Sequence, residues 1–428
     1  MEQITIDIET ASDENIKDCG VYRYAESECF DLLLVSYAVD NGPVATCDIA
    51  NGETLPDDVR NALTDKTVIK KAFHVNFERI CLSVYLRRRY PEMLDFEDST
   101  GSYLDPVSWQ CDMIHCRYLG MLSSLDDMGR LLRLKEKKLA EGKELIRFFC
   151  TLHQEADGSI LFHDKSDAPK KWEKFKAYNR RDVEVELKIQ RYLSEFPVPE
   201  FVWEEFYIDQ EINDRGILVD TSFAKKAVEL DGQVKKALLP KLKELTGLDN
   251  PNSPVQMKEW LMCRGIETDT LDKKFMQKIS GSAPEEVQEV LRLYQQLSRS
   301  SVQKYTTMLR VVCADGRARG MFSFYGANRT GRFAGRLIQL QNLPQNHLDD
   351  LAELKEQIRT GEFDAIKENY DDVPDVLSQL IRTAFIPPEG KKYVVADFSA
   401  IEARVLAWLA DEKWRMQAFA NGEDIYCA

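Results

Sequence analysis

The sequence predicts an α/β fold over about residues 1–195, followed by a mostly helical region. Two observations predict this. Short apolar runs typical of strands alternate with helical stretches in the amino-terminal part of the chain. The segment FPVPEF, residues 196–201, then places two prolines directly after a long helical pattern, which marks a boundary.

The first part contains three strand patterns and two clear helical patterns. The expected strands are ITIDIET (4–10), FDLLLVSYAVD (30–40) and TVIKKAFHV (67–75), and the expected helices cover 125–134 and 172–193. In NSPVQMKEWLMCRG, Ser253 is expected to cap a helix, Gln256 to close a capping box and Gly265 to end it.

The last part of the chain returns to strands. The segment 321–344 is expected to form strand and loop, and 348–370 to be helical. Residues 393–396 are expected to form a buried strand that ends at Asp397, and 399–410 a helix. The apolar residues at helical spacing in that helix are expected in the core: Ile401, Val405, Trp408 and Leu409.

Composition is that of an ordinary globular protein, with 44% hydrophobic and 30% charged residues among 428. No apolar run of about 18 residues occurs, and the start lacks a signal peptide pattern, so residence in the cytoplasm is expected. The ten cysteines include no C-x-x-C pair, which argues against a zinc ribbon or a disulfide framework. Cys111 and Cys116 are expected to be buried free thiols.

The net charge of −15 would not favour nucleic-acid binding if it were evenly spread. One segment reverses it. Between Arg299 and Arg336 eight Lys or Arg residues stand against the single acid Asp315. We define residues 299–336 as the basic strip; it either faces phosphates or forms a solvated basic surface.

In the first strand, Asp7 and Glu9 alternate with isoleucines and therefore emerge on one face. Two nearby carboxylates repel each other unless a cation lies between them, so this pattern is consistent with a metal site. The simple alternative is an edge strand whose acidic face is exposed to solvent. Tyr178 and Asp182 are four residues apart on an expected helix, hence on one face, and Glu78 enters another helix.

These three segments resemble the DEDD exonuclease superfamily, in its tyrosine-containing proofreading subtype, over roughly residues 1–190. The resemblance implies a ribonuclease-H-like fold and two Mg²⁺ ions, replaceable by Mn²⁺, held by Asp7, Glu9, Glu78 and Asp182. Tyr178 would orient the attacking water. The family usually has aspartate where Glu78 stands and asparagine where His74 stands, so His74 receives no role.

The segments NRTGRFAGRLIQLQNLP and VVADFSAIEAR resemble the palm of family A DNA polymerases, in the form common in phages, over about residues 206–428. The resemblance implies that Asp397 is a catalytic metal ligand. It assigns contacts with DNA or nucleotide to Arg332, Gln341, Asn342, Glu402 and Arg404. Ser399 to Glu402 also forms a capping-box pattern, and the two roles of Glu402 can coexist. Lys304 is expected either to touch the duplex backbone or to be an unspecific surface lysine.

The expected organisation is an exonuclease domain at 1–195, a helical thumb-like region at 200–310 and a partial α+β palm at 311–428. Family A polymerases continue with a fingers helix and a second catalytic aspartate, which this sequence lacks, so a fragment, a split enzyme or a degraded gene is expected. The predicted function is that of a proofreading DNA polymerase. From these residues by themselves, only exonuclease activity and DNA binding are expected. The alternatives are a stand-alone single-strand 3′→5′ exonuclease and a non-polymerising subunit. Expected partners are single-stranded 3′ ends, primer–template, deoxynucleoside triphosphates if the site is completed, and a second chain, without a membrane.

Overall fold

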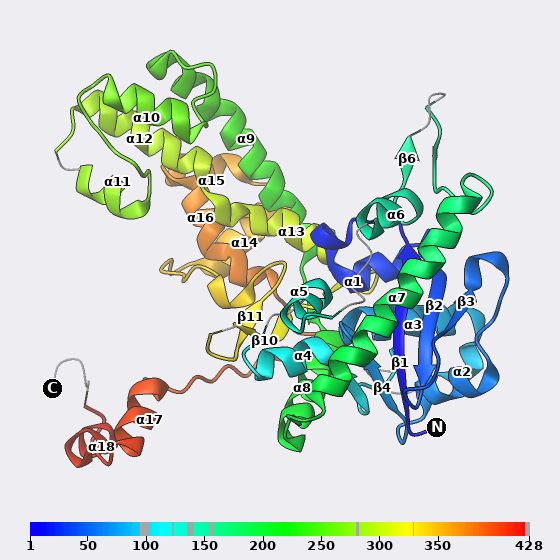
Figure 1. The fold of residues 1–428 in the computed structure, drawn as a ribbon. Coiled ribbons are helices and arrows are strands. Elements are labelled where there is room, and N and C mark those ends of the chain that lie inside the picture. The colour runs from blue at the N-terminus through cyan, green and yellow to red at the C-terminus, as the bar shows by residue number, and fades with distance from the viewer. Residues whose placement is uncertain are drawn as a thin grey trace. The chain divides into compact units, whose positions relative to one another are not determined.

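The computed structural model describes residues 1–94, 103–121, 124–134, 141–154, 158–279, 282–327 and 329–423. It divides into two compact units, Met1–Ile386 and Pro387–Ala428, which are described separately (Figure 1). Asn328 of the segment expected to form strand and loop, and 424–428 at the end of the sequence, lie outside the described residues.

A five-stranded mixed sheet forms the centre of the amino-terminal part, in the order β3-β2-β1-β4-β5. Its strands are β1 (Gln3–Ala11), β2 (Asp31–Val39), β3 (Ala45–Asp48), β4 (Ile69–Ala72) and β5 (Trp109–Cys111). Strand β1 runs antiparallel to β2 and parallel to β4, and β4 runs parallel to β5. The three strands expected from the sequence are therefore present, and the acidic one is central rather than at an edge.

Both faces of this sheet are covered. Ile4, Ile6 and Ile8 pack into one core with α3 (Val75–Arg89). The alternate residues of β1 face α7 (Pro169–Leu193), where Gln190 accepts a hydrogen bond from Thr5 at 3.0 Å. The period of two in β1 thus separates an apolar layer from a polar layer.

The remaining helices of the first unit follow in chain order. They are α1 (Ile16–Glu26), α2 (Asp57–Thr64), α4 (Asp112–Tyr118), α5 (Leu125–Leu131), α6 (Gly142–Phe149), α8 (Glu200–Arg215), α9 (Thr221–Thr246), α10 (Pro254–Met262), α11 (Lys273–Ile279), α12 (Glu285–Ser298), α13 (Gln303–Val311), α14 (Leu351–Thr360), α15 (Phe363–Asn369) and α16 (Val373–Leu380). Short 3₁₀ turns are η1 (Ile49–Asn51), η2 (Pro91–Met93), η3 (Ser300–Val302), η4 (Leu340–Asn342) and η5 (Ile381–Ala384). The helices predicted at 172–193 and within 252–265 are confirmed as α7 and the shorter α10.

Helix α10 begins at the expected cap, where Ser253 accepts a hydrogen bond from the backbone NH of Gln256. The capping box is not closed, however, because the side chain of Gln256 accepts from the NH of Asn250 at 3.0 Å instead. Gly265 has φ +77°, the left-handed conformation that glycine adopts without strain after a helix.

Three small two-stranded sheets complete the first unit. They pair β6 (His153–Gln154) with β7 (Ile160–Leu161), β8 (Ile217–Leu218) with β9 (Arg317–Ala318), and β10 (Phe322–Ala327) with β11 (Arg332–Gly335). The β10–β11 hairpin confirms the strand-and-loop expectation for this segment, and α14 and α15 confirm the helical one at 348–370.

The second unit contains α17 (Ile401–Leu409) and α18 (Lys413–Ala420). The strand predicted at 393–396 is wrong: this segment is irregular, and Val394 and Val395 are 86% and 90% exposed. A strand needs a neighbour to satisfy its backbone groups, and no strand occurs among the described residues of this unit. The expectation that 401, 405, 408 and 409 are core is also wrong, because all four side chains are exposed.

Within the part of the chain that the structure covers, no helix combines the length and apolarity needed to span a bilayer. Cys111 and Cys116 are buried free thiols, as expected.

Candidate active site

A cavity of about 620 Å³ opens at one edge of the central sheet. Its lining combines apolar and small polar residues with Tyr24, Tyr178 and six acids. The acids are Asp7, Glu9, Asp13, Glu14, Glu78 and Asp182. All five residues that the sequence singled out for nuclease chemistry therefore meet at one cavity, although they come from three separate segments.

The parallel pairing of β1 and β4 explains this meeting. The carboxyl ends of parallel strands lie at the same edge of a sheet, so Asp7 and Glu9 of β1 come near the start of α3, which follows β4. Glu78 lies in the first turn of α3. A bulge interrupts the pairing of β1 with β2 between Glu9 and Thr10, and bulges commonly re-aim side chains next to functional sites.

Glu78 is a buried acid of this cavity with a strongly raised pKa. Its side chain is buried, and burial, followed by the charge of Asp7, holds its pKa well above the usual range. Its Oε2 atom has no hydrogen-bond partner among the described residues. A buried carboxylate oxygen of this kind is a suitable ligand for a cation.

Tyr178 lies one helical turn before Asp182 on α7 and is 1% exposed. Burial raises the pKa of its phenol, and the charges of Asp182, Glu9 and Asp7 raise it further. The hydroxyl therefore keeps its proton and remains a hydrogen-bond donor. Gly142, at the start of α6, lies so close to the ring that a methyl group there would overlap it.

Asn179 is a site residue that the sequence reasoning missed. It is fully buried on α7, and its Nδ2 donates to Oδ2 of Asp7 at 2.6 Å, which fixes the orientation of that carboxylate. Helical spacing could have identified it, because residues 179, 182 and 186 share one face of α7.

A second pair of buried acids lies nearby. Asp112, the first residue of α4, and Glu186 of α7 share a hydrogen bond, and Gln190 Nε2 donates to Asp112 at 2.6 Å. Burial raises the pKa of both acids, and for Glu186 the charge of Asp112 adds to the effect. Two like charges at this separation cannot both ionise readily, so the pair retains a proton.

The donor set of the cavity fits a hard divalent cation, since Mg²⁺ prefers carboxylate oxygens. Nevertheless, no three His, Cys, Asp or Glu side chains among the described residues stand close enough together to share one ion. The chemistry of the donors fits, while their final arrangement is not preformed.

His74 is not part of this cavity. It lines a separate small pocket with Asn76, Asp209 and Arg336. Burial, and then the charges of Arg336 and Arg117, lower its pKa to about 4, so it is neutral at physiological pH.

Most of the residues assigned to duplex contacts lie at the surface of the first unit. Arg332 of β11 and Gln341 and Asn342 of η4 are exposed. Lys304 is half-buried, and its Nζ donates to the backbone oxygen of Ile338 at 2.6 Å. That bond joins α13 to the segment after the β10–β11 hairpin, which gives Lys304 a structural role that the sequence did not predict.

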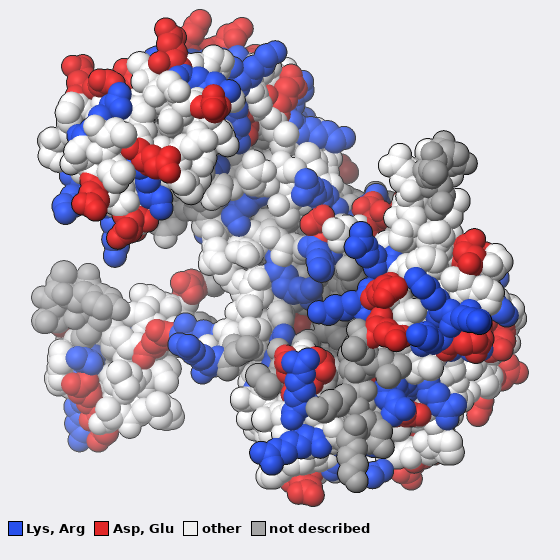
Figure 2. Space-filling view, turned by 45° about the horizontal axis from the view of Figure 1, so that its top comes forward, with Lys and Arg blue, Asp and Glu red and all other residues white. Residues whose placement is uncertain are grey.

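The basic strip is partly neutralised within the protein. Arg299 pairs with Asp372 at 2.9 Å and with Asp375, and Arg319 pairs with Asp315 at 2.6 Å. Figure 2 shows acidic and basic side chains interspersed over the face that it draws. The strip is therefore not a continuous free basic surface, and its exposed arginines are Arg310, Arg329, Arg332 and Arg336.

The remaining predicted site residues lie in the second unit. Asp397 and Glu402 are exposed, as is Arg404, whose Nε donates to the backbone oxygen of Ser399 at 2.8 Å. Ala400, in the left-handed conformation, is the cap residue of α17, so the capping box expected from Ser399 is absent.

Comparison with known proteins gives three findings. Residues 222–428 match the model of DNA polymerase family A. A DNA polymerase of Bacillus phage SP02 is 43% identical over 429 residues, covering 100% of this chain and 64% of that protein. DNA polymerase I of Borreliella burgdorferi is 26% identical over 220 residues, covering 50% of this chain and 21% of that protein. This chain therefore spans less than two thirds of the length of these relatives.

Among solved structures, the POL domain of Pol1 from M. smegmatis, in complex with DNA primer-template and dNTP, is similar with a TM-score of 0.57. The match covers 99% of this chain and 61% of that one at 17% identity, which shows a similarity of fold alone. The sequence matches are more specific: residues 222–428 of this chain are similar to DNA polymerase family A.

Proposed function

We propose that this chain is part of a proofreading DNA polymerase and that its amino-terminal cavity is a metal-dependent 3′→5′ exonuclease site. The observation that carries the proposal is the meeting of Asp7, Glu9, Glu78 and Asp182 with Tyr178 around one cavity. The strand order of the central sheet and the helix spacing of Tyr178 and Asp182 support a ribonuclease-H-like nuclease of the tyrosine subtype.

Two Mg²⁺ ions, or Mn²⁺ in their place, would be held by the four carboxylates. Bound there, they would stabilise the entering and leaving oxygens of a phosphodiester cleavage. Two other residues would orient a metal ligand and donate a hydrogen bond. Asn179 holds the carboxylate of Asp7, and the un-ionised hydroxyl of Tyr178 is available to donate a hydrogen bond to a water or to a phosphate oxygen.

The substrate of this site is proposed to be a single-stranded DNA 3′ end. The family A sequence of residues 222–428 supports DNA as the partner, with primer–template held by exposed groups such as Arg332, Gln341 and Asn342. Arginine suits phosphate oxygens, and amides suit sugar and base edges in the minor groove. Deoxynucleoside triphosphates would engage Asp397, Glu402 and Arg404 once that site has a fixed geometry.

The experiment compares nucleotide release from a 3′-labelled single-stranded oligonucleotide by the wild-type chain and by Asp7→Ala, in Mg²⁺. We expect the cleavage rate of the variant to fall more than about 100-fold. Replacing even a residue that only hydrogen-bonds to a metal ligand lowers metal affinity or activity by about 10- to 100-fold. Asp58→Ala, which removes an exposed acid on α2, is the matched control and should cleave normally. Unchanged release by Asp7→Ala would refute the nuclease proposal.

One observation favours nuclease activity without primer extension from these residues. Asp397 is exposed and lies outside any helix or strand, and catalytic groups need placement to within a fraction of an ångström. Adding primed template and deoxynucleoside triphosphates to the same assay tests this. We expect shortening of the primer, whereas extension by one or more nucleotides would contradict the expectation.

A further inference from the structure

The most deeply buried ion pair of the described chain joins α3 to α8. Arg79 is fully buried, and its Nη1 and Nη2 donate to Oδ2 and Oδ1 of Asp214 at 2.8 and 2.7 Å. The Asp214 side chain is 2% exposed. A bidentate pair of this kind fixes both the distance and the orientation of the two helices that carry it.

Arg79 directly follows Glu78, a proposed metal ligand of the cavity. Consecutive residues of a helix point about 100° apart, so this one turn presents Glu78 to the cavity and Arg79 to α8. The free Oε2 atom of Glu78 shows that this oxygen is not held by a hydrogen bond from any described residue. Its position therefore depends on how the first turn of α3 is held.

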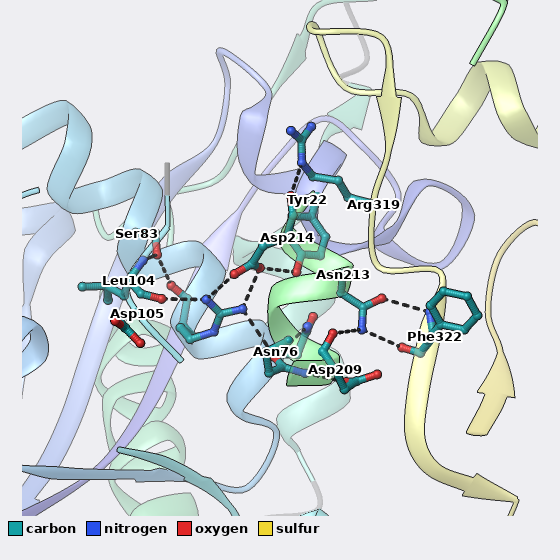
Figure 3. A network of polar contacts seen from close by, with 12 residues as sticks. Tyr22, Asn76, Ser83, Leu104, Asp105, Asp209, Asn213, Asp214, Arg319 and Phe322 are labelled. Atoms are coloured by element: carbon teal, nitrogen blue, oxygen red, sulfur yellow. Dashed lines mark hydrogen bonds and ion pairs between the residues drawn. The ribbon is translucent and has the colours of Figure 1, made fainter. Parts of the chain in front are cut away.

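Helix α8 is itself held from several sides at the same level (Figure 3). Tyr22 of α1 donates its hydroxyl proton to Asp214 at 2.6 Å, and Nε of Arg319 donates to the Asp214 backbone oxygen at 2.6 Å. One residue earlier, Asn213 bonds both the NH and the carbonyl oxygen of Phe322, at 3.0 and 3.3 Å. The end of α8 thus ties α1, α3 and the start of β10 together.

We infer that Arg79 and Asp214 are positioning residues of the proposed nuclease site, which hold Glu78 at the cavity by fixing the first turn of α3 against α8. The inference rests on the proposed function. Asp214, on the helix that leads into the segment matching the polymerase family model, would then strengthen cation binding in the cavity although it does not line the cavity. A merely structural pair would affect folding stability but not the affinity of the cavity for a divalent ion.

The test removes the pair without leaving a buried charge. The variant combines Arg79→Met and Asp214→Leu, because apolar replacements of both partners preserve folding far better than the loss of one. Tyr22→Phe is added since the hydroxyl of Tyr22 donates to Asp214. Lys355→Met is the matched control, because it breaks the ion pair with Asp220 at 3.0 Å in a different core cluster.

Two quantities are measured on the full chain: the dissociation constant for Mn²⁺ by electron paramagnetic resonance, without DNA, and the Mg²⁺ concentration for half-maximal cleavage. In the triple variant we expect both to rise about tenfold, while the cleavage rate at saturating Mg²⁺ stays within about twofold of wild type. Lys355→Met should lower the unfolding midpoint and leave both quantities unchanged.

Wild-type Mn²⁺ affinity in a folded triple variant would overturn the inference and leave the proposed function standing. If the triple variant does not fold, Asp214→Asn decides, since it keeps the shape of the side chain but replaces one of the two oxygens that accept from Arg79 with a donor, which breaks the bidentate pair. Wild-type affinity in that variant would equally overturn the inference. A wild-type chain that shows no Asp7-dependent cleavage would overturn the proposed function and this inference with it.

Discussion

Tyr178 illustrates how much of the proposed site depends on single contacts. Burial, followed by the charges of three nearby acids, raises the pKa of its phenol, and its ring packs against Gly142 at the start of α6. Helical spacing made Tyr178 and Asp182 predictable from the sequence. Gly142 was not predictable, because its role comes from a contact between distant segments and leaves no periodic pattern.

Gly142→Ala should reduce DNA cleavage without removing a reactive atom. The added methyl overlaps the Tyr178 ring and must displace it, and a shift of about 1 Å at such a site costs up to roughly 100-fold in rate. Because both substitutions act through one phenol, Gly142→Ala combined with Tyr178→Phe should be no slower than the slower single variant. Rates in Mg²⁺ with a single-stranded oligonucleotide measure this.

Gly129→Ala on α5 is the matched control for that comparison. A methyl there would meet its nearest neighbour, Val185, at 3.9 Å, an ordinary contact. Full activity in Gly142→Ala would show that the ring of Tyr178 does not need its present position.

Among the helices, α8 carries buried polar residues that bond to segments far apart in the sequence, from Tyr22 to Phe322. Asp209 on this helix is 2% exposed, and its Oδ2 accepts a hydrogen bond from Gln210 at 2.9 Å. Burial raises its pKa from 3.8 to about 7. The folded chain therefore binds a proton at Asp209 between about pH 4 and pH 7 that the unfolded chain has lost.

Asp209→Asn should flatten the pH dependence of stability in that window. With a raised carboxyl pKa, the stabilising contribution of the proton is complete below about pH 4 and is lost as pH rises to about 7. The free energy of unfolding of the variant, relative to wild type, should therefore increase by up to about 4 kcal/mol between pH 4 and pH 8. Urea titrations at both pH values measure it, and parallel curves would contradict the assignment.

An element could be predicted from the sequence when burial of one of its faces stabilises it, because such burial leaves a periodic pattern. Strand β1 and helix α7 have periodic patterns because each buries a face within the first unit, and both were predicted. The segment 393–396 has an equally apolar pattern, but a strand also needs a partner, which no local pattern reveals. The carboxyl ends of β1 and β4 meet through their parallel pairing, so the gathering of Glu78 with Asp7 needed the family resemblance as well as the pattern.

At the scale of the whole molecule, the first compact unit extends to Ile386 and so includes both the five-stranded sheet and much of the segment that matches the polymerase family model. The prolines at 197 and 199 do separate α7 from α8, as predicted. Buried polar contacts nevertheless cross that point, including the pair of Arg79 with Asp214. The predicted domain boundaries at 195–200 and 310–311 remain predictions.

The central claim is that four acids from three segments of the first unit form one cation site. Anomalous X-ray scattering from crystals of the chain soaked in Mn²⁺ tests it most directly. We predict two manganese peaks in the cavity, each with oxygen atoms of Asp7, Glu9, Glu78 or Asp182 at about 2.0–2.6 Å, the range for hard divalent cations and carboxylates. A cavity without a manganese peak at saturating Mn²⁺ would contradict the account.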